Sequence, residues 1–171
     1  NERLAPPDRS GFPVDLVDNR ARWVRAEGEK VARRDPPLAH HAETETCARC
    51  HSRRTALVDG SVPGAALSET HLLSLLETGL YHDDGQILDE VYVHGSFLQS
   101  RMYAEGVTCS DCHDPHRGTL LLEGNALCSG CHDPGIYDVA THHHHADGGE
   151  GSGCIDCHMI SRTYMGVDPR R

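Results

Sequence analysis

The motif Cys-x-x-Cys-His occurs four times in this chain of 171 residues and uses all eight of its cysteines. The two thiols of such a motif can form thioether bonds to one haem, while the adjacent imidazole binds the iron. The pattern therefore predicts four covalently bound haem c groups. The four copies are Cys47, Cys50, His51; Cys109, Cys112, His113; Cys128, Cys131, His132; and Cys154, Cys157, His158, each histidine being the proximal iron ligand.

Zinc is the main alternative to haem. Paired Cys-x-x-Cys segments also form structural zinc sites, and redox-active dithiols share the same spacing. Neither alternative needs a histidine directly after the second cysteine. With 14 histidines in 171 residues, chance would place one there about 8 times in 100 for one motif and roughly 4 times in 100,000 for all four. The pattern therefore favours haem.

The supply of large apolar side chains is small, with two Phe, one Trp and five Tyr. Four haems would add large, flat apolar bodies within the size of one domain. We therefore predict a mainly α fold with much irregular loop, in which the chain wraps around four covalently bound haems. Residues 1–17 are rich in proline and are predicted to form an extended arm, and residues 18–171 a single tetrahaem domain.

The net charge of −10 makes nucleic acid an unsuitable partner. The basic cluster between Arg20 and Arg34 is expected to be solvated surface. No apolar run reaches the roughly 18 residues that a membrane span needs, so we expect a soluble chain. The chain begins at Asn1 without a signal peptide, and we therefore expect a processed form or an excised piece.

Capping residues, apolar spacing and glycine stops predict three helices. The first covers residues 19–34, begins at Asp18 and carries Trp23 as a packing residue. The second follows Ser68 and stops at Gly79. The third follows Ser96 and stops at Gly106, and residues 87–93 are expected to be extended.

Ten of the 14 histidines remain once the four proximal ligands are assigned. This number exceeds the four distal positions and favours six-coordinate, bis-histidine iron, which exchanges electrons but leaves no position for a substrate. A methionine ligand would raise one haem potential, but the three methionines are explained by packing. The predicted distal ligands are His82, His116 and two from His94, His143 and His144.

Two features single out histidines for this role. His116 lies three residues after His113 in CHDPH, whereas the repeated CHDPG has Gly135 there, so we expect the same local turn in both copies. Three residues are too few to reach the far face of the same ring, so His116 is expected to ligate a neighbouring haem. The run His142 to His145 is expected to supply one or two distal ligands, with a metal-binding tract or a purification tag as alternatives.

Several segments around the motifs are distinctive: CARCHSRR, YVHGSFLQSRMYAEGVTCSDCHDPH, EGNALCSGCH, YDVATHHHH and CIDCHMISRTYMGVDPRR. Over about residues 20–171 they resemble a family of bacterial multihaem c-type cytochromes, which look related to the ammonia-forming nitrite reductase and hydroxylamine oxidoreductase group. In that group a CHxPH arrangement lets the second histidine ligate an adjacent haem, which supports His116. The resemblance also implies a periplasmic or extracellular location. Members are usually longer, and this chain lacks the Cys-x-x-Cys-Lys motif of the nitrite-reducing haem, so that activity is not implied.

The leading functional hypothesis is electron transfer through four closely spaced haems. The chain would be either a carrier that meets redox partner proteins or a subunit of an extracellular filament of identical chains. An oxidoreductase acting on a small nitrogen or sulfur species at a five-coordinate haem is the alternative. A haem-based sensor or storage protein is a third class.

Overall fold

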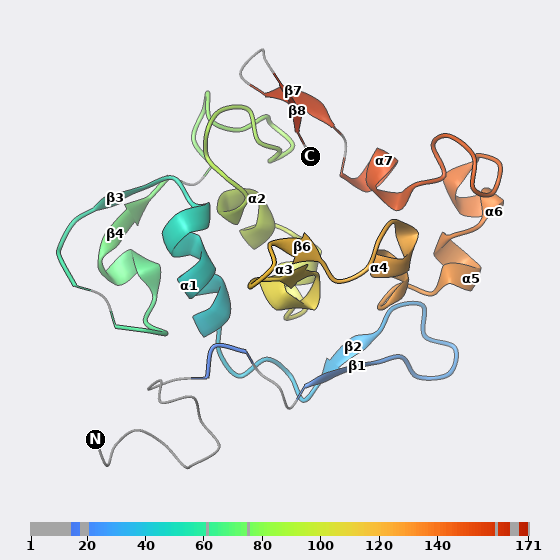
Figure 1. Cartoon of the computed structure of the whole chain (residues 1–171), viewed down its shortest axis with the longest axis horizontal. Coiled ribbons are helices and arrows are strands. Elements are labelled where there is room, and N and C mark those ends of the chain that lie inside the picture. Colours follow the sequence, from blue (N-terminus) through green and yellow to red (C-terminus); the bar gives the residue numbers. More distant parts are fainter. Residues whose placement is uncertain are drawn as a thin grey trace. The chain divides into compact units, whose positions relative to one another are not determined.

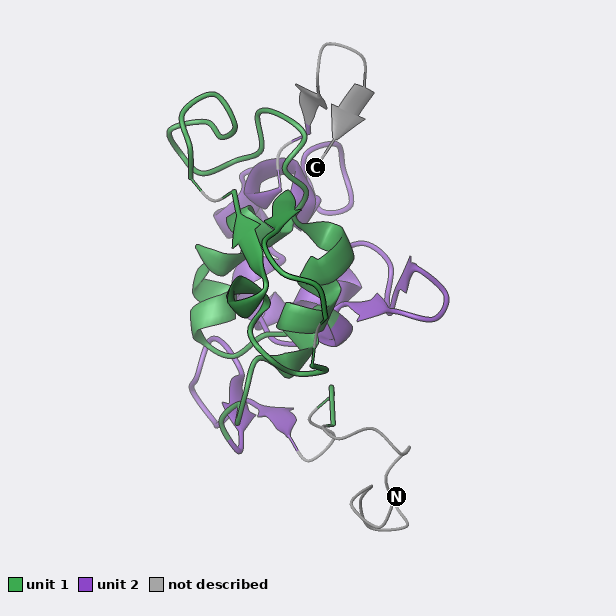
Figure 2. Cartoon of the chain, turned by 90° about the vertical axis from the view of Figure 1, so that its left-hand side faces the viewer, with its two compact units in different colours: residues 1–20, 37–109 green, residues 21–36, 110–171 purple. Residues whose placement is uncertain are grey.

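The computed structural model (Figure 1) describes residues 15–17, 21–60, 62–74, 76–159, 161–164 and 168–170. Most of the predicted arm, residues 1–17, lies outside this part of the chain. The chain forms two compact units (Figure 2): unit 1 contains residues 1–20 and 37–109, and unit 2 contains residues 21–36 and 110–171. The single domain predicted for residues 18–171 stays a prediction.

Helix and strand content are both modest, and irregular loops connect short elements. The described residues of unit 1 form α1 (Ala42–His51), β3 (Arg54–Ala56), the 3-10 turn η1 (Leu67–Glu69), β4 (His71–Leu73), α2 (His94–Leu98) and α3 (Arg101–Ala104). The 3-10 turn η2 (Cys109–Asp111) begins at the last residue of unit 1. Those of unit 2 form β1 (Arg22–Val24), β2 (Arg33–Asp35), β5 (His113–Asp114), β6 (Thr119–Leu120), α4 (Asn125–Ser129), α5 (Pro134–Tyr137), α6 (Ala140–His143), α7 (Cys154–His158), β7 (Arg162–Tyr164) and β8 (Asp168–Arg170).

The four described sheets are antiparallel strand pairs: β1 with β2, β3 with β4, β5 with β6, and β7 with β8. The predicted mainly α class therefore holds only in part, because the helices are shorter than expected and many short strands accompany them. Within the described part of the chain, every helix is too short or too polar to cross a membrane.

The helix predicted over residues 19–34 is wrong for its described part, because residues 22–35 form the β1–β2 hairpin. Its predicted cap, Asp18, lies outside the described residues. Trp23 pairs with Arg34 across the hairpin. Gly28 lies in the turn with φ +82°, a conformation that glycine adopts without steric cost. Val24 and Val31, the apolar positions of the expected helix, are 50% and 36% exposed. These two valines therefore do not form an apolar face packed on a core.

The helix predicted after Ser68 is also wrong. Here η1 is followed by β4, whose residues His71–Leu73 pair with Arg54–Ala56 of β3. The start of η1 is fixed by the Leu67 backbone N–H, which donates to Glu45 Oε2 on α1 at 2.7 Å. Leu72 is 63% exposed, so the leucines do not share one buried face. A tertiary contact and strand pairing outweigh the local helical pattern.

The third predicted helix is present but differs in its bounds. Helix α2 begins at His94 rather than after Ser96, and the chain breaks before α3. Ser100 caps α3 by accepting the Tyr103 N–H on Oγ at 3.1 Å. Gly106, with φ +85°, follows as the predicted stop. In the segment predicted to be extended, residues 87–93, Ile87 makes a single bridge to Tyr81.

Few apolar side chains are buried among the described residues. Unit 1 buries five, which are Ala42, Ala48, Leu67, Tyr81 and Val91. In the described part of unit 2, Ala32 is the one apolar side chain of this kind. Polypeptide packing alone therefore gives unit 2 very little core.

Candidate haem-attachment site

Helical backbone carries at least the first cysteine of each Cys-x-x-Cys-His motif. The first motif occupies the end of α1, the fourth is α7, and Cys109 and Cys128 lie in η2 and α4. Past the end of α4, the His132 N–H still donates to the Cys128 carbonyl oxygen at 2.9 Å. Residues i and i+3 of a helical turn lie on one side, so each motif presents both thiols together. No disulfide joins any of the eight cysteines.

Thiols of different motifs come close together in unit 2. Cys128 of the third motif hydrogen bonds to Cys154 of the fourth, and burial together with Cys128 raises the pKa of the Cys154 thiol. Burial, Asp111 and the thiols of Cys112 and Cys128 raise the pKa of Cys131 to about 11. The fold therefore brings the third and fourth motifs together within this unit, with Cys112 of the second motif near Cys131.

Unit 1 contains a corresponding pair. The thiols of Cys47 and Cys109 share a hydrogen bond, which lowers the pKa of Cys47 and raises that of Cys109. Beside the first motif, a cavity of about 300 Å³ is lined by residues that include Arg49, Arg54 and His71. Arg49 is one of the two residues between Cys47 and Cys50. Basic side chains thus lie directly against this motif.

The β1–β2 hairpin is fixed to the second motif through Asp111. Trp23 Nε1 donates to Asp111 Oδ1 at 2.8 Å, and an Arg34 guanidinium nitrogen lies 3.0 Å from Asp111 Oδ2. The Arg34 side chain is 5% exposed and lies over the Trp23 ring, 5.8 Å from its centroid. The expectation that this basic cluster is solvated surface is therefore wrong for Arg34.

The same hairpin also pairs with the backbone of the third motif. The Ala32 N–H donates to the Cys131 carbonyl oxygen at 2.8 Å, and the Asp133 N–H donates to the Lys30 carbonyl oxygen at 2.9 Å. Val31 forms an antiparallel bridge with His132. Residues 21–36 therefore support the second and third motifs, both of which lie far from this hairpin in the sequence. The sequence analysis did not predict this role.

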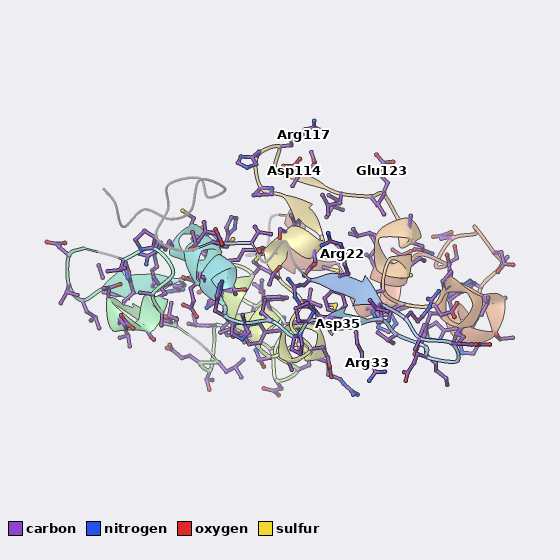
Figure 3. All side chains as sticks on the ribbon, turned by 90° about the horizontal axis from the view of Figure 1, so that it is seen from below. Arg22, Arg33, Asp35, Asp114, Arg117 and Glu123 are labelled. Atoms are coloured by element: carbon purple, nitrogen blue, oxygen red, sulfur yellow. The ribbon has the colours of Figure 1, made fainter. Side chains whose placement is uncertain are left out.

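The predicted repeat of the turn after the second and third motifs is confirmed for its first step. Asp114 Oδ1 accepts the His116 N–H at 2.9 Å, and Asp133 Oδ1 accepts the Gly135 N–H at 2.9 Å. The chain then diverges, because the first copy closes the β5–β6 hairpin and the second opens α5. Figure 3 shows Asp114, the last residue of β5, and Arg117, which lies in the turn of that hairpin.

Asn125 was missed by the sequence analysis and connects three segments of unit 2. Its side-chain Nδ2 donates to Asp138 Oδ1 at 2.7 Å and to the Ser152 carbonyl oxygen at 3.0 Å, while its Oδ1 accepts the Cys154 N–H at 2.8 Å. The third motif is therefore tied to the first residue of the fourth. A single Asn three residues before Cys128 was the only sequence signal.

The proximal histidines differ in exposure. His51, His113 and His158 are exposed, whereas His132 is half-buried. Burial and the neighbouring His158 lower the pKa of His132. A lowered pKa keeps the imidazole neutral, which is the form that binds metal ions.

The predicted distal ligands lie in varied surroundings. His94 is 4% exposed, and burial lowers its pKa although Glu45 acts in the opposite direction. His82 is half-buried, whereas His116 and His144 are exposed. The His143 side chain is 9% exposed, with Nε2 3.7 Å from Asp147 Oδ1. None of these five rings contacts a motif histidine within the described residues, so their assignment as ligands stays a prediction.

The apolar surface around the motifs suits haem. Exposed large apolar side chains follow or lie within the last three motifs: Leu120, Leu121, Leu122, Ile136, Ile155 and Met159. A closed zinc site needs four converging ligands. Within the described residues, no group of three or more His, Cys, Asp or Glu side chains is placed to hold a metal ion. Haem needs two thiols, axial imidazoles and apolar contact. Each motif supplies two thiols and one imidazole, and the exposed apolar side chains supply the apolar contact.

Residues 102–136, which contain the second and third motifs, match the protein-family model described as the doubled CXXCH motif. The match indicates a multihaem c-type cytochrome. It supports covalently bound haem c at paired motifs of this kind. The comparisons with curated proteins and with solved structures gave no match. The predicted likeness to the nitrite reductase and hydroxylamine oxidoreductase group gains no support from these comparisons.

Proposed function

We propose that this chain transfers electrons through four covalently bound haem c groups, one at each Cys-x-x-Cys-His motif. The supporting observation is the proximity of thiols from different motifs: Cys47 with Cys109 in unit 1, and Cys128 with Cys154 in unit 2. Each thiol is the attachment point of a haem edge. Attachment points in contact favour closely spaced redox centres.

The residues that would hold each haem are the two cysteines of a motif, its histidine and a second axial histidine. Bound haem supplies an iron that changes oxidation state by one electron. Packed against bound haem, the apolar side chains around the motifs would exclude water from it. The Asn125 hydrogen bonds, the Trp23 and Arg34 contacts with Asp111, and the strand pairing of His132 hold the motifs of unit 2 in place.

We place the chain in the periplasm or outside the cell, where redox partner proteins or identical subunits would receive its electrons. The carrier and filament forms stay as alternatives within this proposal. Electron microscopy of the native material separates them, since a carrier gives dispersed particles and a filament gives extended polymers.

A redox titration followed by absorption spectroscopy tests the proposal. We expect reversible reduction in several steps, because neighbouring haems interact, and no spectral change when nitrite or cyanide is added to the oxidised protein. The matched variant carries Cys154→Ser and Cys157→Ser and is expected to lose one haem of four. A high-spin haem that binds nitrite in the native protein would contradict electron transfer alone and favour the oxidoreductase.

A further inference from the structure

The histidine run of residues 142–145 contains one ring that faces a motif histidine. The rings of His142 and His158 have their centroids 6.1 Å apart and are parallel to within 5°. His142 lies in α6 and His158 ends α7, both in unit 2. The distal ligands predicted from the run were His143 and His144, so the structure points to a different member.

The separation of the two ring centroids is the one that a shared metal ion requires when a ring nitrogen of each imidazole points at it. Metal–imidazole bonds are about 2 Å long, so two imidazoles that bind one ion from opposite sides have ring centroids roughly 6 Å apart. Offset aromatic stacking covers the same range of distances. The position of the pair favours an ion, because His158 is itself the expected proximal ligand of the fourth motif.

Among the described contacts, none of the other three rings of the run faces a motif histidine. His143 accepts the His145 N–H on Nδ1 at 3.2 Å, and its Nε2 lies 3.7 Å from Asp147. His144 is the left-handed C-cap of α6, with φ 63° and an exposed side chain. The His145 ring lies against Gly151. In the described structure, neither ring nitrogen of His142 has a hydrogen-bond partner, so both remain able to bind a metal ion.

Tyr137 holds the His142 ring in this position. The Tyr137 ring lies edge-on to His142, with centroids 5.3 Å apart and planes at 85°. It meets His132 in the same way, at 5.6 Å and 89°. Edge-to-face contacts of this kind stabilise a defined ring orientation. A single tyrosine therefore lies between the third motif and the His142–His158 pair.

We infer that His142 is the distal iron ligand of the haem attached at Cys154 and Cys157, opposite His158. The inference rests on the proposed function, since it requires haem at the fourth motif. Tyr137 is a positioning residue for this ligand. The fourth haem would then be six-coordinate and closed to substrates.

Electron paramagnetic resonance of the oxidised protein tests the inference, with haem content measured on the same sample. In His142→Ala we expect one haem of four to become high-spin, with a loss of about one quarter of the low-spin signal. Added imidazole is expected to restore the low-spin state by occupying the open position. The control is Thr141→Ala on the same helix, because Thr141 is exposed and carries no ring nitrogen that could bind iron. It is expected to keep all haems low-spin.

Low-spin haems throughout His142→Ala would overturn the inference, as would a high-spin haem in His143→Gln but not in His142→Ala. If the alanine variant loses the fourth haem altogether, His142→Met decides, because a methionine ligand raises the potential of one haem. Unchanged potentials in that variant would overturn the assignment. A native protein without covalent haem would contradict the proposed function itself, whereas four haems with an unaffected His142 variant contradict only this inference.

Discussion

At the scale of single residues, the side chain of Asn125 makes hydrogen bonds to three other residues of unit 2. One amide group satisfies an acceptor on Asp138, a backbone carbonyl at Ser152 and the backbone N–H of Cys154. Half-buried polar groups that lose such partners are left without full hydrogen bonding. Asn125 therefore fixes the start of the fourth motif relative to the third.

Asn125→Ala is expected to lower the free energy of unfolding by about 2 to 3 kcal/mol, since three hydrogen bonds to buried or half-buried partners are lost. Chemical denaturation followed by circular dichroism measures the loss. Thr141→Ala is the matched control, because Thr141 is exposed on α6 and its removal should change stability by less than about 0.5 kcal/mol. Equal effects of the two variants would show that the Asn125 contacts do not contribute.

The Cys-x-x-Cys-His residues could be found from sequence because their chemistry requires a fixed local spacing. Asn125 and His142 could not, because their roles depend on segments that meet only in the folded chain. Four adjacent histidines are indistinguishable by composition. The contacts of His143 with Asp147 and of His142 with His158 distinguish them.

At the scale of elements, the β1–β2 hairpin shows how a tertiary contact overrides a local pattern. Residues 19–34 have helical apolar spacing, yet Gly28 favours a turn and the two strands pair with each other and with the third motif. The capping turn at Asp133 depends only on neighbouring residues and was predictable. Local signals therefore predicted the turn after the motifs and the stop at Gly106, whereas the helix caps predicted at Ser68 and Ser96 were wrong. Element type followed from docking.

Trp23→Phe is expected to lower the free energy of unfolding by about 2 kcal/mol, because Asp111 loses the 2.8 Å hydrogen bond from the indole nitrogen. Arg34 keeps its contact with the same carboxylate, so the hairpin should remain docked. Circular dichroism of thermal or chemical unfolding gives the change. The neighbouring Val24→Ala is the control, as Val24 is 50% exposed and should have little effect. A stability unchanged by Trp23→Phe would indicate that strand pairing alone positions the hairpin.

At the scale of the whole molecule, the account depends on haem as the main apolar material. The described part of unit 2 buries one apolar side chain, Ala32, while leucines, isoleucines and a methionine near its motifs are exposed. Burial of apolar surface is the dominant favourable contribution to folding. Haem bodies covering those side chains would supply the surface that the polypeptide lacks. The predicted helix content was too high, because short elements are enough to place motifs around a cofactor and long helices are not needed.

The mass of the native chain after denaturation tests the central claim most directly. Thioether-bound haem stays attached when the fold is lost, whereas zinc and non-covalently bound haem are released. We predict a single species with the mass of the polypeptide plus four haem groups. The mass of the polypeptide alone would contradict haem attachment at the Cys-x-x-Cys-His motifs and, with it, electron transfer as the function of the chain.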